Sequence, residues 1–415
     1  MQILSHFPFL EVNLMDFSWT DEQEIWRRTV RDFAQKKIKP RVREIDTNKK
    51  IPEEIIKDMS KLGLLAPTTS QKYGGADLDW TMACIAAEEL GRADISLAIP
   101  VLYLVEAAWG FIFNRYGTEK AKEKYLPKVT SGDAFCGIAV TEPTGGSDIV
   151  GAAKTTAIKK SNKWILNGEK IFISGITESS KWGGIHLTLA RTDPSKGHKG
   201  FSFFAVPLKD NPNVETTLLE DMGRMGISTG GFVMNDIELP EHHLIGELDR
   251  GFYYAMEGFS AARVLIGATC VGASEAALEL GMDHIKTRRA FGRPLGSFEG
   301  IQFPLAEHYC NIEGVKLLTY RAAWTMDKMY KEKKRTHHDV AIAAAMSKLR
   351  APIHAFEVMN EVADWLGATG YTKEYPIEMG IRGVRSYSIG AEGTMNIMRI
   401  IIARELLGKE FLPYQ

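Results

Sequence analysis

The 415-residue sequence has little cysteine and none of the common cysteine or histidine metal motifs. Its four cysteines, Cys84, Cys136, Cys270 and Cys310, are far apart and form no CxxC, which excludes a disulfide framework and a zinc ribbon. We expect them to be small buried hydrophobic residues in a reducing compartment. The ten histidines form no HExxH motif. We therefore predict no metal site and a cytoplasmic location.

Long apolar runs and an excess of one charge are also lacking. The longest uncharged apolar stretches, such as residues 95–105, are shorter than the roughly 18–20 residues of a membrane span. The first fourteen residues contain no Lys or Arg and resemble no targeting signal, so we interpret residues 1–14 as an N-terminal extension. The 51 basic and 52 acidic residues leave a net charge of −1. We therefore expect no nucleic-acid partner and no membrane partner.

Helical periodicity dominates both ends of the chain, and a segment of β character separates them. Apolar residues recur three and four positions apart through residues 15–135, where Thr20 and Gln23 have the spacing of a capping box. Residues 136–250 hold short strand-like runs divided by Gly and Pro. There, Asn167-Gly168 predicts a type I′ turn between strands at 163–166 and 169–174. Long helical segments return over residues 251–415 and suit a bundle.

This order of elements predicts an α+β chain of several domains. It is not the βαβ alternation of a Rossmann fold, and the GxGxxG and P-loop motifs are missing. Any bound nucleotide must therefore be held in another way.

The first chemical motif is AVTEPTGGSD at residues 139–148, on the boundary between the helical and β segments. A Gly pair beside hydroxyl groups and backbone donors suits the approach of a phosphate or a planar ring. A turn of this composition is otherwise simply structural. The whole string resembles the first signature of the acyl-CoA dehydrogenase family, which are flavoproteins that desaturate acyl thioesters.

Further family landmarks follow in the same order. KIFISGI, residues 170–176, resembles the segment beside the flavin, with Phe172 and Ser174 where the family has Trp and Thr. The phenyl ring keeps an aromatic plane, and the hydroxyl could donate to flavin N5. TRRAFGRPL, residues 287–295, resembles the element that reaches the FAD of a neighbouring subunit. The resemblance implies that Arg288 pairs with the pyrophosphate, which a forked guanidinium matches well.

AEGTMNIMRIIIAREL, residues 391–406, carries the residue that matches the family's catalytic base. Glu392 precedes an apolar helical run that Thr394 could cap. An isolated Glu there would usually be an acid attracted to a helix N-terminus, but the resemblance implies that Glu392 abstracts the α-proton. Burial would raise its pKa toward that of a useful base. The alternative family position for the base, within residues 260–263, has no carboxylate.

Two departures from the family pattern accompany this motif. Gly383 stands where the family has Asp after Arg, and Ala391 is one extra residue before Glu392. An extra residue could move the carboxylate or reshape the acyl pocket.

The resemblance implies two sets of binding residues in addition to the base. The FAD set is Ile138, Val140, Thr141, Gly146, Ser147, Phe172, Ile173, Ser174, Arg288, Phe291, Phe298, Gln302, Asp364, Gly367, Ala368, Thr394 and Asn396. The acyl-CoA set is Ser147, Ser260, Arg263, Gly393 and Arg404. By rough alignment, Tyr103, Leu104 and Trp109 line the acyl pocket or are ordinary core residues.

The implied architecture is a helical domain at 15–135, a barrel-like or sandwich-like β domain at 136–250 and a four-helix bundle at 251–415. The implied enzyme is an FAD-dependent acyl-CoA dehydrogenase, a homotetramer that forms trans-2-enoyl-CoA and passes electrons to an electron-transfer flavoprotein. One alternative is an acyl-CoA oxidase or flavin monooxygenase of the same fold. The other is a DNA-associated flavoprotein, which the balanced charge disfavours.

Overall fold

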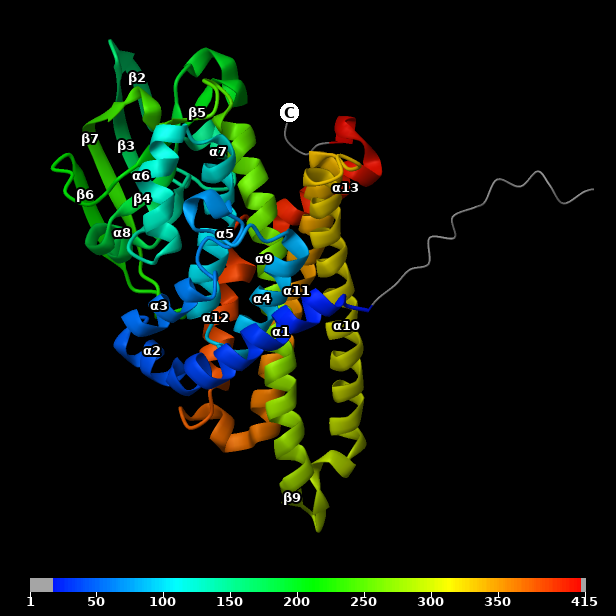
Figure 1. Cartoon of the computed structure of the whole chain (residues 1–415). Helices are drawn as coiled ribbons and strands as arrows, with labels where there is room; N and C mark the ends of the chain where they lie inside the picture. The colour runs from blue at the N-terminus through cyan, green and yellow to red at the C-terminus, as the bar shows by residue number, and fades with distance from the viewer. Residues whose placement is uncertain (1–17, 412–415) are drawn as a thin grey trace, which may run out of the picture.

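The computed structural model describes residues 18–411 and contains two helical regions with a sheet between them (Figure 1). The predicted N-terminal extension lies outside the described residues. The first region contains α1 (Asp21–Phe33), α2 (Val42–Asn48), α3 (Glu53–Lys61), α4 (Trp80–Ala93), α5 (Ala98–Tyr116) and α6 (Glu119–Thr130). The predicted capping box is confirmed, because Gln23 N–H donates to Thr20 Oγ1 at 3.2 Å and Thr20 N–H donates to Gln23 Oε1 at 3.1 Å.

The middle region is a mixed sheet. Its strands are β1 (Phe135–Ala139), β2 (Thr156–Lys160), β3 (Lys163–Ser174), β4 (Gly184–Arg191), β5 (Phe201–Val206), β6 (Val214–Leu219), β7 (Thr229–Pro240) and β8 (Leu244–Ile245). Their order is β6-β7-β3-β2-β4-β5-β8, and β1 pairs with β4 in parallel. The short helices α7 (Ile149–Ala152) and α8 (Ile176–Trp182) lie between strands in the sequence.

The predicted hairpin turn at Asn167-Gly168 is wrong. Both residues lie inside β3, and the hairpin instead joins β2 to β3 across Ser161, whose φ is 53°. The register of β3 with β7 shifts at Gly168, whose φ is 143°. A Cβ on Gly168 would lie 2.6 Å from the Cα of Thr155. Glycine is thus required here by close backbone approach within a bulged strand and not by a turn.

The last region is built from long helices: α9 (Gly251–Thr287), α10 (Glu299–Tyr330), α11 (His337–Leu366), α12 (Ile377–Ile389) and α13 (Met395–Leu407). The small hairpin of β9 (Arg289–Ala290) and β10 (Arg293–Pro294) joins α9 to α10, at the end of the molecule far from the sheet (Figure 1). By length and composition α9 could cross a membrane, but 78% of its most apolar window is buried inside the protein. Such burial is usual for the central helix of a bundle.

One large apolar core joins the helices of both ends of the chain, and a smaller core lies within the sheet region. Cys84, Cys136 and Cys270 are buried, as expected. The expectation fails for Cys310, which is exposed on α10. That position belongs to a long outer face of the helix, which this chain alone does not cover.

Candidate active site

The predicted base lies in a tight turn between α12 and α13, residues 390–393, which we call the base turn. Gly393 N–H donates to the Gly390 carbonyl at 3.0 Å, so Ala391 and Glu392 are the two central residues of a four-residue turn. Glu392 has a φ of 57° and Gly393 a φ of 103°. A positive φ is strained for Glu, and such strain persists only where surrounding structure enforces it. The apparent extra residue, Ala391, is accommodated in this turn. The Thr394 side chain caps α13, as predicted.

Two buried cations hold the peptide groups that follow the Glu392 side chain. Arg263 Nε, from α9, donates to the Glu392 carbonyl at 2.8 Å. The ammonium of Lys348, from α11, donates to the Gly393 carbonyl. Arg263 is 5% exposed and Lys348 is fully buried. A Cβ on Gly393 would lie 3.1 Å from Met398 Cε and 3.4 Å from Arg263 Nη2, so glycine is favoured here mainly by its positive φ.

The surroundings of Glu392 favour a carboxyl that titrates near neutrality. Burial raises the pKa of Glu392 to about 7, against the opposing charges of Arg263, Lys348 and Arg224. Burial also lowers the pKa of Lys348 to about 7 and that of Arg263 to about 10. A base of this strength suits proton removal from a carbon acid at physiological pH.

A second cluster lies around the turn formed by AVTEPTGGSD, residues 139–148, which we call the flavin turn. Lys170 Nζ, from β3, forms an ion pair with Glu142 Oε1 at 2.7 Å and donates to the Val140 carbonyl at 3.1 Å. Both partners are buried. Glu142 also accepts backbone N–H groups from Lys154 and Thr155. The pair thus fixes the turn in front of β3.

The residues around this turn fit a planar polar cofactor. Ile171 N–H donates to the Thr141 carbonyl at 3.0 Å, which brings the turn against the strand. Phe172 has a φ of 60° and its ring is 66% exposed, at the second irregularity of β3. The hydroxyl of Ser174 has no hydrogen-bond partner among the described residues. An exposed aromatic ring on strained backbone, beside an unused hydroxyl, is what a stacked ring system with polar edges would cover.

The predicted FAD residues fall into separate places along this chain. One group surrounds the turn and β3: Ile138, Val140, Thr141, Gly146, Ser147, Phe172, Ile173 and Ser174. A second group lies at the far end of the bundle: Arg288, Phe291, Phe298, Gln302, Asp364, Gly367 and Ala368. Thr394 and Asn396 stand at the start of α13 near the base. The family resemblance anticipated this separation for residues 287–295, which it implied reach the FAD of a neighbouring subunit.

The far group lies at the opposite end of the molecule from the sheet that carries the flavin turn (Figure 1). At 1.5 Å per helical residue, α9 places Thr287 about 36 Å from Arg263. Phe291 is 96% exposed at the tip of the β9–β10 hairpin (Figure 1). Arg288 and Gln302 are exposed as well. These side chains are therefore presented outward, as residues that serve a neighbouring molecule would be.

The predicted acyl-CoA residues lie mainly along α9 and α13. Ser260 is buried on α9 beside a cleft of about 240 Å³, whose wall also includes Met256 and Tyr254. Arg404, on α13, forms an ion pair with Glu405 at 3.1 Å. Ser147 is exposed on the flavin turn. In sequence order, Glu392 lies between α9 and α13. Ser147 lies apart from them, on the flavin turn.

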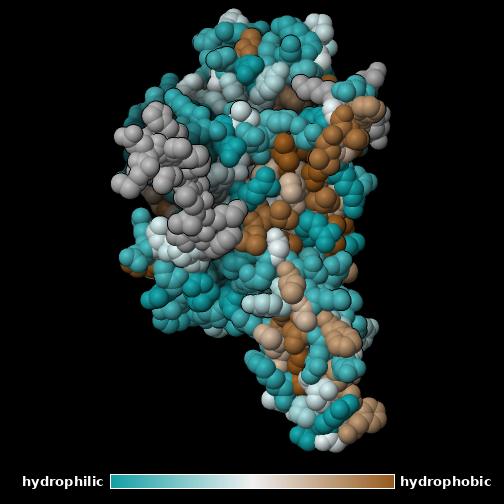
Figure 2. Space-filling model, turned by 90° about the vertical axis from the view of Figure 1, so that its right-hand side faces the viewer, coloured by the Kyte–Doolittle hydropathy of each residue, from teal (hydrophilic) through white to brown (hydrophobic). Residues whose placement is uncertain are grey.

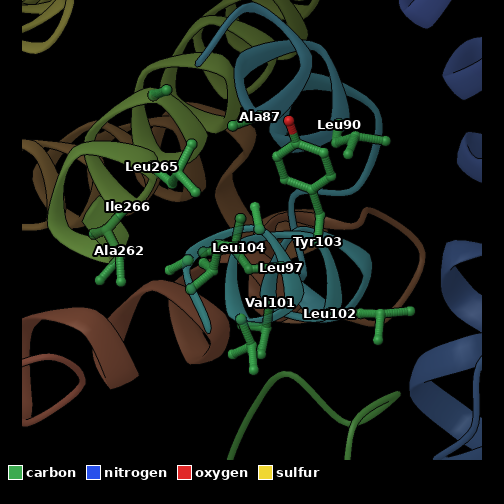
Figure 3. Close-up of a cluster of buried hydrophobic side chains, with 14 of the residues drawn as sticks. Ala87, Leu90, Leu97, Val101, Leu102, Tyr103, Leu104, Ala262, Leu265 and Ile266 are labelled. Carbon is green, nitrogen blue, oxygen red and sulfur yellow. The ribbon is translucent and has the colours of Figure 1, made fainter. Parts of the chain in front are cut away.

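The structure distinguishes between the two alternatives for Tyr103. The Tyr103 ring points toward α4, near Ala87 and Leu90 (Figure 3), and its hydroxyl donates to the Ala83 carbonyl at 2.8 Å. Tyr103 is therefore a core residue, because its hydroxyl needs a buried partner that α4 supplies. Leu104 lies on the side of α5 that faces α9 (Figure 3).

Trp109, the third of these candidates, is fully buried and packs edge-on against Phe259 at 5.4 Å between ring centroids. A Cβ on Gly258 would lie 2.1 Å from its ring, so α9 approaches the indole closely. Its indole N–H has no partner among the described residues.

Sequence reasoning missed two cations near the base. Lys348 lies on the buried face of α11, in line with Ala344, Ala351 and Ala355. Because lysine is rarely buried, its place on this apolar face could have indicated a functional position. Arg224 is in the loop between β6 and β7, with a φ of 59°. Nothing in its local sequence indicated a position near Glu392.

Comparison with known proteins gives one consistent family. The chain matches the acyl-CoA dehydrogenase N-terminal domain over residues 20–133, the middle domain over 137–237 and the C-terminal domain over 249–407. An acyl-CoA dehydrogenase of Bacillus subtilis is 36% identical over 394 residues, covering 94% of this chain and 99% of that protein.

Solved structures with the same fold are consistent with this family. Butyryl-CoA dehydrogenase from Megasphaera elsdenii has a TM-score of 0.85 at 30% identity, covering 95% of this chain and 100% of that chain. A chain from a structure of the electron transferring flavoprotein of Acidaminococcus fermentans has a TM-score of 0.86 at 32% identity, with the same coverage.

The fold and the site thus define a flavin-dependent oxidoreductase of three domains, with helical N- and C-terminal domains and a middle sheet domain. The chain belongs to the acyl-CoA dehydrogenase family. Its cofactor is FAD, and its general reaction is the dehydrogenation of an acyl-CoA.

Proposed function

We propose that Glu392 removes the α-proton of an acyl-CoA and that the β-hydrogen leaves as hydride to bound FAD, which together convert the thioester to the trans-2-enoyl-CoA. The observation that supports this role is the base turn, where a carboxyl with a pKa near 7 is held in strained backbone by Arg263 and Lys348. A carboxyl that is half ionised near neutrality accepts a proton far better than an ordinary Glu.

Positive charge around Glu392 supports the same chemistry. Loss of the α-proton places negative charge on the thioester, and fixed cations in a dry site stabilise such charge strongly. Arg263 and Lys348 donate to backbone carbonyls beside Glu392, and their charges would also act on a thioester bound at that carboxyl. The Glu392 N–H lies in the same turn, where it could donate to the thioester carbonyl.

Bound FAD supplies the acceptor for the hydride that leaves the β-carbon. The residues proposed to hold it are Phe172 and Ser174 beside its ring system, with Thr141 from the turn that Lys170 and Glu142 fix. These groups orient the ring and exclude water from one side of it.

We propose a homotetramer as the working form, because the exposed far group can then complete the FAD site of a neighbour. The side of the molecule formed by α10 and α13 supports this assembly. Figure 2 shows apolar patches there, and the exposed apolar residues include Phe303, Leu317, Trp324, Leu406 and Leu407. A second copy is the natural occupant of so extended an apolar face.

We propose an electron-transfer flavoprotein as the physiological electron acceptor. The structural likeness to a chain from the electron transferring flavoprotein work on Acidaminococcus fermentans supports this partner. The cytoplasm remains our proposed location. An acyl-CoA oxidase is the alternative to be tested, since it would use oxygen directly.

The test is anaerobic bleaching of the flavin by a panel of straight, branched, cyclic and aryl acyl-CoAs. We expect at least one to bleach the wild-type flavin, with an enoyl-CoA product and no oxygen consumption in air. Glu392→Gln should retain FAD and bind that acyl-CoA without bleaching. Glu106→Gln is the matched control, because it replaces a buried carboxyl on α5 that lies outside the base turn and should bleach normally. Substantial bleaching by Glu392→Gln would show that the base lies elsewhere.

A further inference from the structure

Lys348 is a buried amine that forms no ion pair among the described residues, although the charge of Glu392 acts on it. Its side chain is fully buried on the apolar face of α11, and its hydrogen bond goes to the neutral carbonyl of Gly393. Burying an unpaired charge is costly, so a lysine in this position requires a compensating role. The Lys348 ammonium lies beside the one peptide turn that carries the base.

We propose that Lys348 is a positioning residue that holds the Glu392 carboxyl in its reactive place, a role that rests on the proposed function of Glu392. Arg263 and Lys348 come from different helices and bind two successive carbonyls, those of Glu392 and Gly393. On the other side, the turn is closed by Gly393 N–H and Gly390. The strained turn is thus fixed from α9, α11 and α12 together.

The geometry explains why two cations are needed. Glu392 and Gly393 are both in the left-handed region, and a Glu relaxes from it readily unless its peptide planes are fixed. Releasing the Gly393 carbonyl frees the second of these planes. The carboxyl would then move relative to the substrate, and a misplacement of about 1 Å can cost about 100-fold in rate.

Lys348 also contributes charge to the site. The charged and titratable groups around Glu392 are Arg263 from α9, Lys348 from α11, Arg224 from the β6–β7 loop and Tyr387 from α12. All three cations lower the pKa of Glu392 against the effect of burial. Loss of the Lys348 charge should therefore raise the pKa of Glu392 further, whereas a lysine that only fills space would leave it unchanged.

The other neighbour of Lys348 is the thiol of Cys270, whose pKa burial raises above its ordinary range. A neutral thiol does not compensate the ammonium. The Gly393 carbonyl is the hydrogen-bond acceptor that the described structure offers to Lys348, and the charges of Arg263 and Glu392 also act on it.

The experiment compares Lys348→Met and Lys348→Arg with Ser347→Ala. Ser347 is the next residue on α11, is buried, and lies 2.8 Å from Thr319 through its hydroxyl, so its substitution perturbs the same helix without touching the turn. Infrared difference spectra against Glu392→Gln give the pKa of the Glu392 carboxyl without any substrate. Anaerobic flavin bleaching against pH is then measured with an acyl-CoA that bleaches wild type.

We expect Lys348→Met to keep FAD, to raise the pKa of Glu392 and to slow bleaching at pH 7 by about tenfold or more. Lys348→Arg, which keeps the charge and a donor, should restore much of the rate, and Ser347→Ala should match wild type in both measurements. If the Met variant does not fold, Lys348→Gln replaces it in the comparison with Lys348→Arg. An unchanged pKa and rate in the neutral variant, or equal changes in Ser347→Ala, would overturn the proposal. Failure of wild type to bleach would instead count against the proposed function.

Discussion

The buried pair of Lys170 and Glu142 gives the sharpest prediction about the flavin turn. The pair is 2.7 Å apart, with side chains 0% and 3% exposed. Lys170→Met would leave the Glu142 carboxylate buried without its cation, and breaking a buried pair costs about 3–5 kcal/mol. In this variant Glu142 still accepts hydrogen bonds from the backbone N–H groups of Lys154 at 2.5 Å and Thr155 at 3.1 Å. We therefore expect a loss at the lower end of that range, about 3 kcal/mol.

The free energy of unfolding is measured by urea titration, and the melting temperature by calorimetry. With an unfolding entropy of about 2.1 cal/mol/K per residue over 415 residues, a loss of about 3 kcal/mol corresponds to a fall of roughly 3–4 °C in melting temperature. FAD release should also quicken, because Lys170 anchors the Val140 carbonyl next to Thr141. The double variant with Glu142→Gln should lose less than the sum of the single variants, since no charge is then left unpaired.

Lys163→Met is the matched control for this substitution. Lys163 lies on the same strand and pairs with Glu238 at 2.5 Å, but the two side chains are 50% and 57% exposed. Exposed pairs contribute about 0–1 kcal/mol. If Lys170→Met were no more destabilising than Lys163→Met, the assignment of stability to burial of the pair would be refuted.

Three further predictions follow from the charges and exposures above. Bleaching by acyl-CoA should become faster as the pH rises through about 7, because Glu392 must be ionised to act as a base, and a rate that is flat from pH 5.5 to 8.5 would contradict this. Arg288→Ala should lose FAD on gel filtration, and FAD retention equal to wild type would exclude that contact. Burial raises the pKa of Glu106 well above its ordinary value, and its Oε2 has no partner among the described residues. The stability of wild type should therefore fall relative to Glu106→Gln as the pH rises above about 4.5, and parallel pH profiles in thermal melts would argue against an uncompensated acid.

The sequence predicted the helix caps correctly, because a cap depends only on residues within a few positions of one another. The capping box of Thr20 and Gln23 and the cap at Thr394 both form as predicted. The turn at Asn167-Gly168 was wrong because the same dipeptide also suits a bulged strand. The close approach of Thr155, which decides between the two, involves the neighbouring strand segment and its packing.

The candidate site shows the same division between local motif and tertiary surroundings. The Glu-Gly-Thr motif located Glu392, but the cations around it come from α9, α11 and the β6–β7 loop. Their sequence separations are large, so no local pattern could bring them together. Similarly, alignment left Tyr103 either in the acyl pocket or in the core, and only the position of α4 shows that it is a core residue.

The length of α9 has a consequence for how the enzyme can change. The helix carries Arg263 near one active site and ends at Arg288, which we assign to the cofactor of another copy. A single inserted residue between them would rotate Arg288 by about 100° and shift it by about 1.5 Å without altering any contact of Glu392. Even a seven-residue insertion, which nearly preserves the rotation, would move the hairpin by about 10 Å. The length of α9 therefore fixes the distance between Arg263 at one active site and Arg288 at the other. Changes in the length of α9 should be tolerated far less than changes in the loops of the sheet.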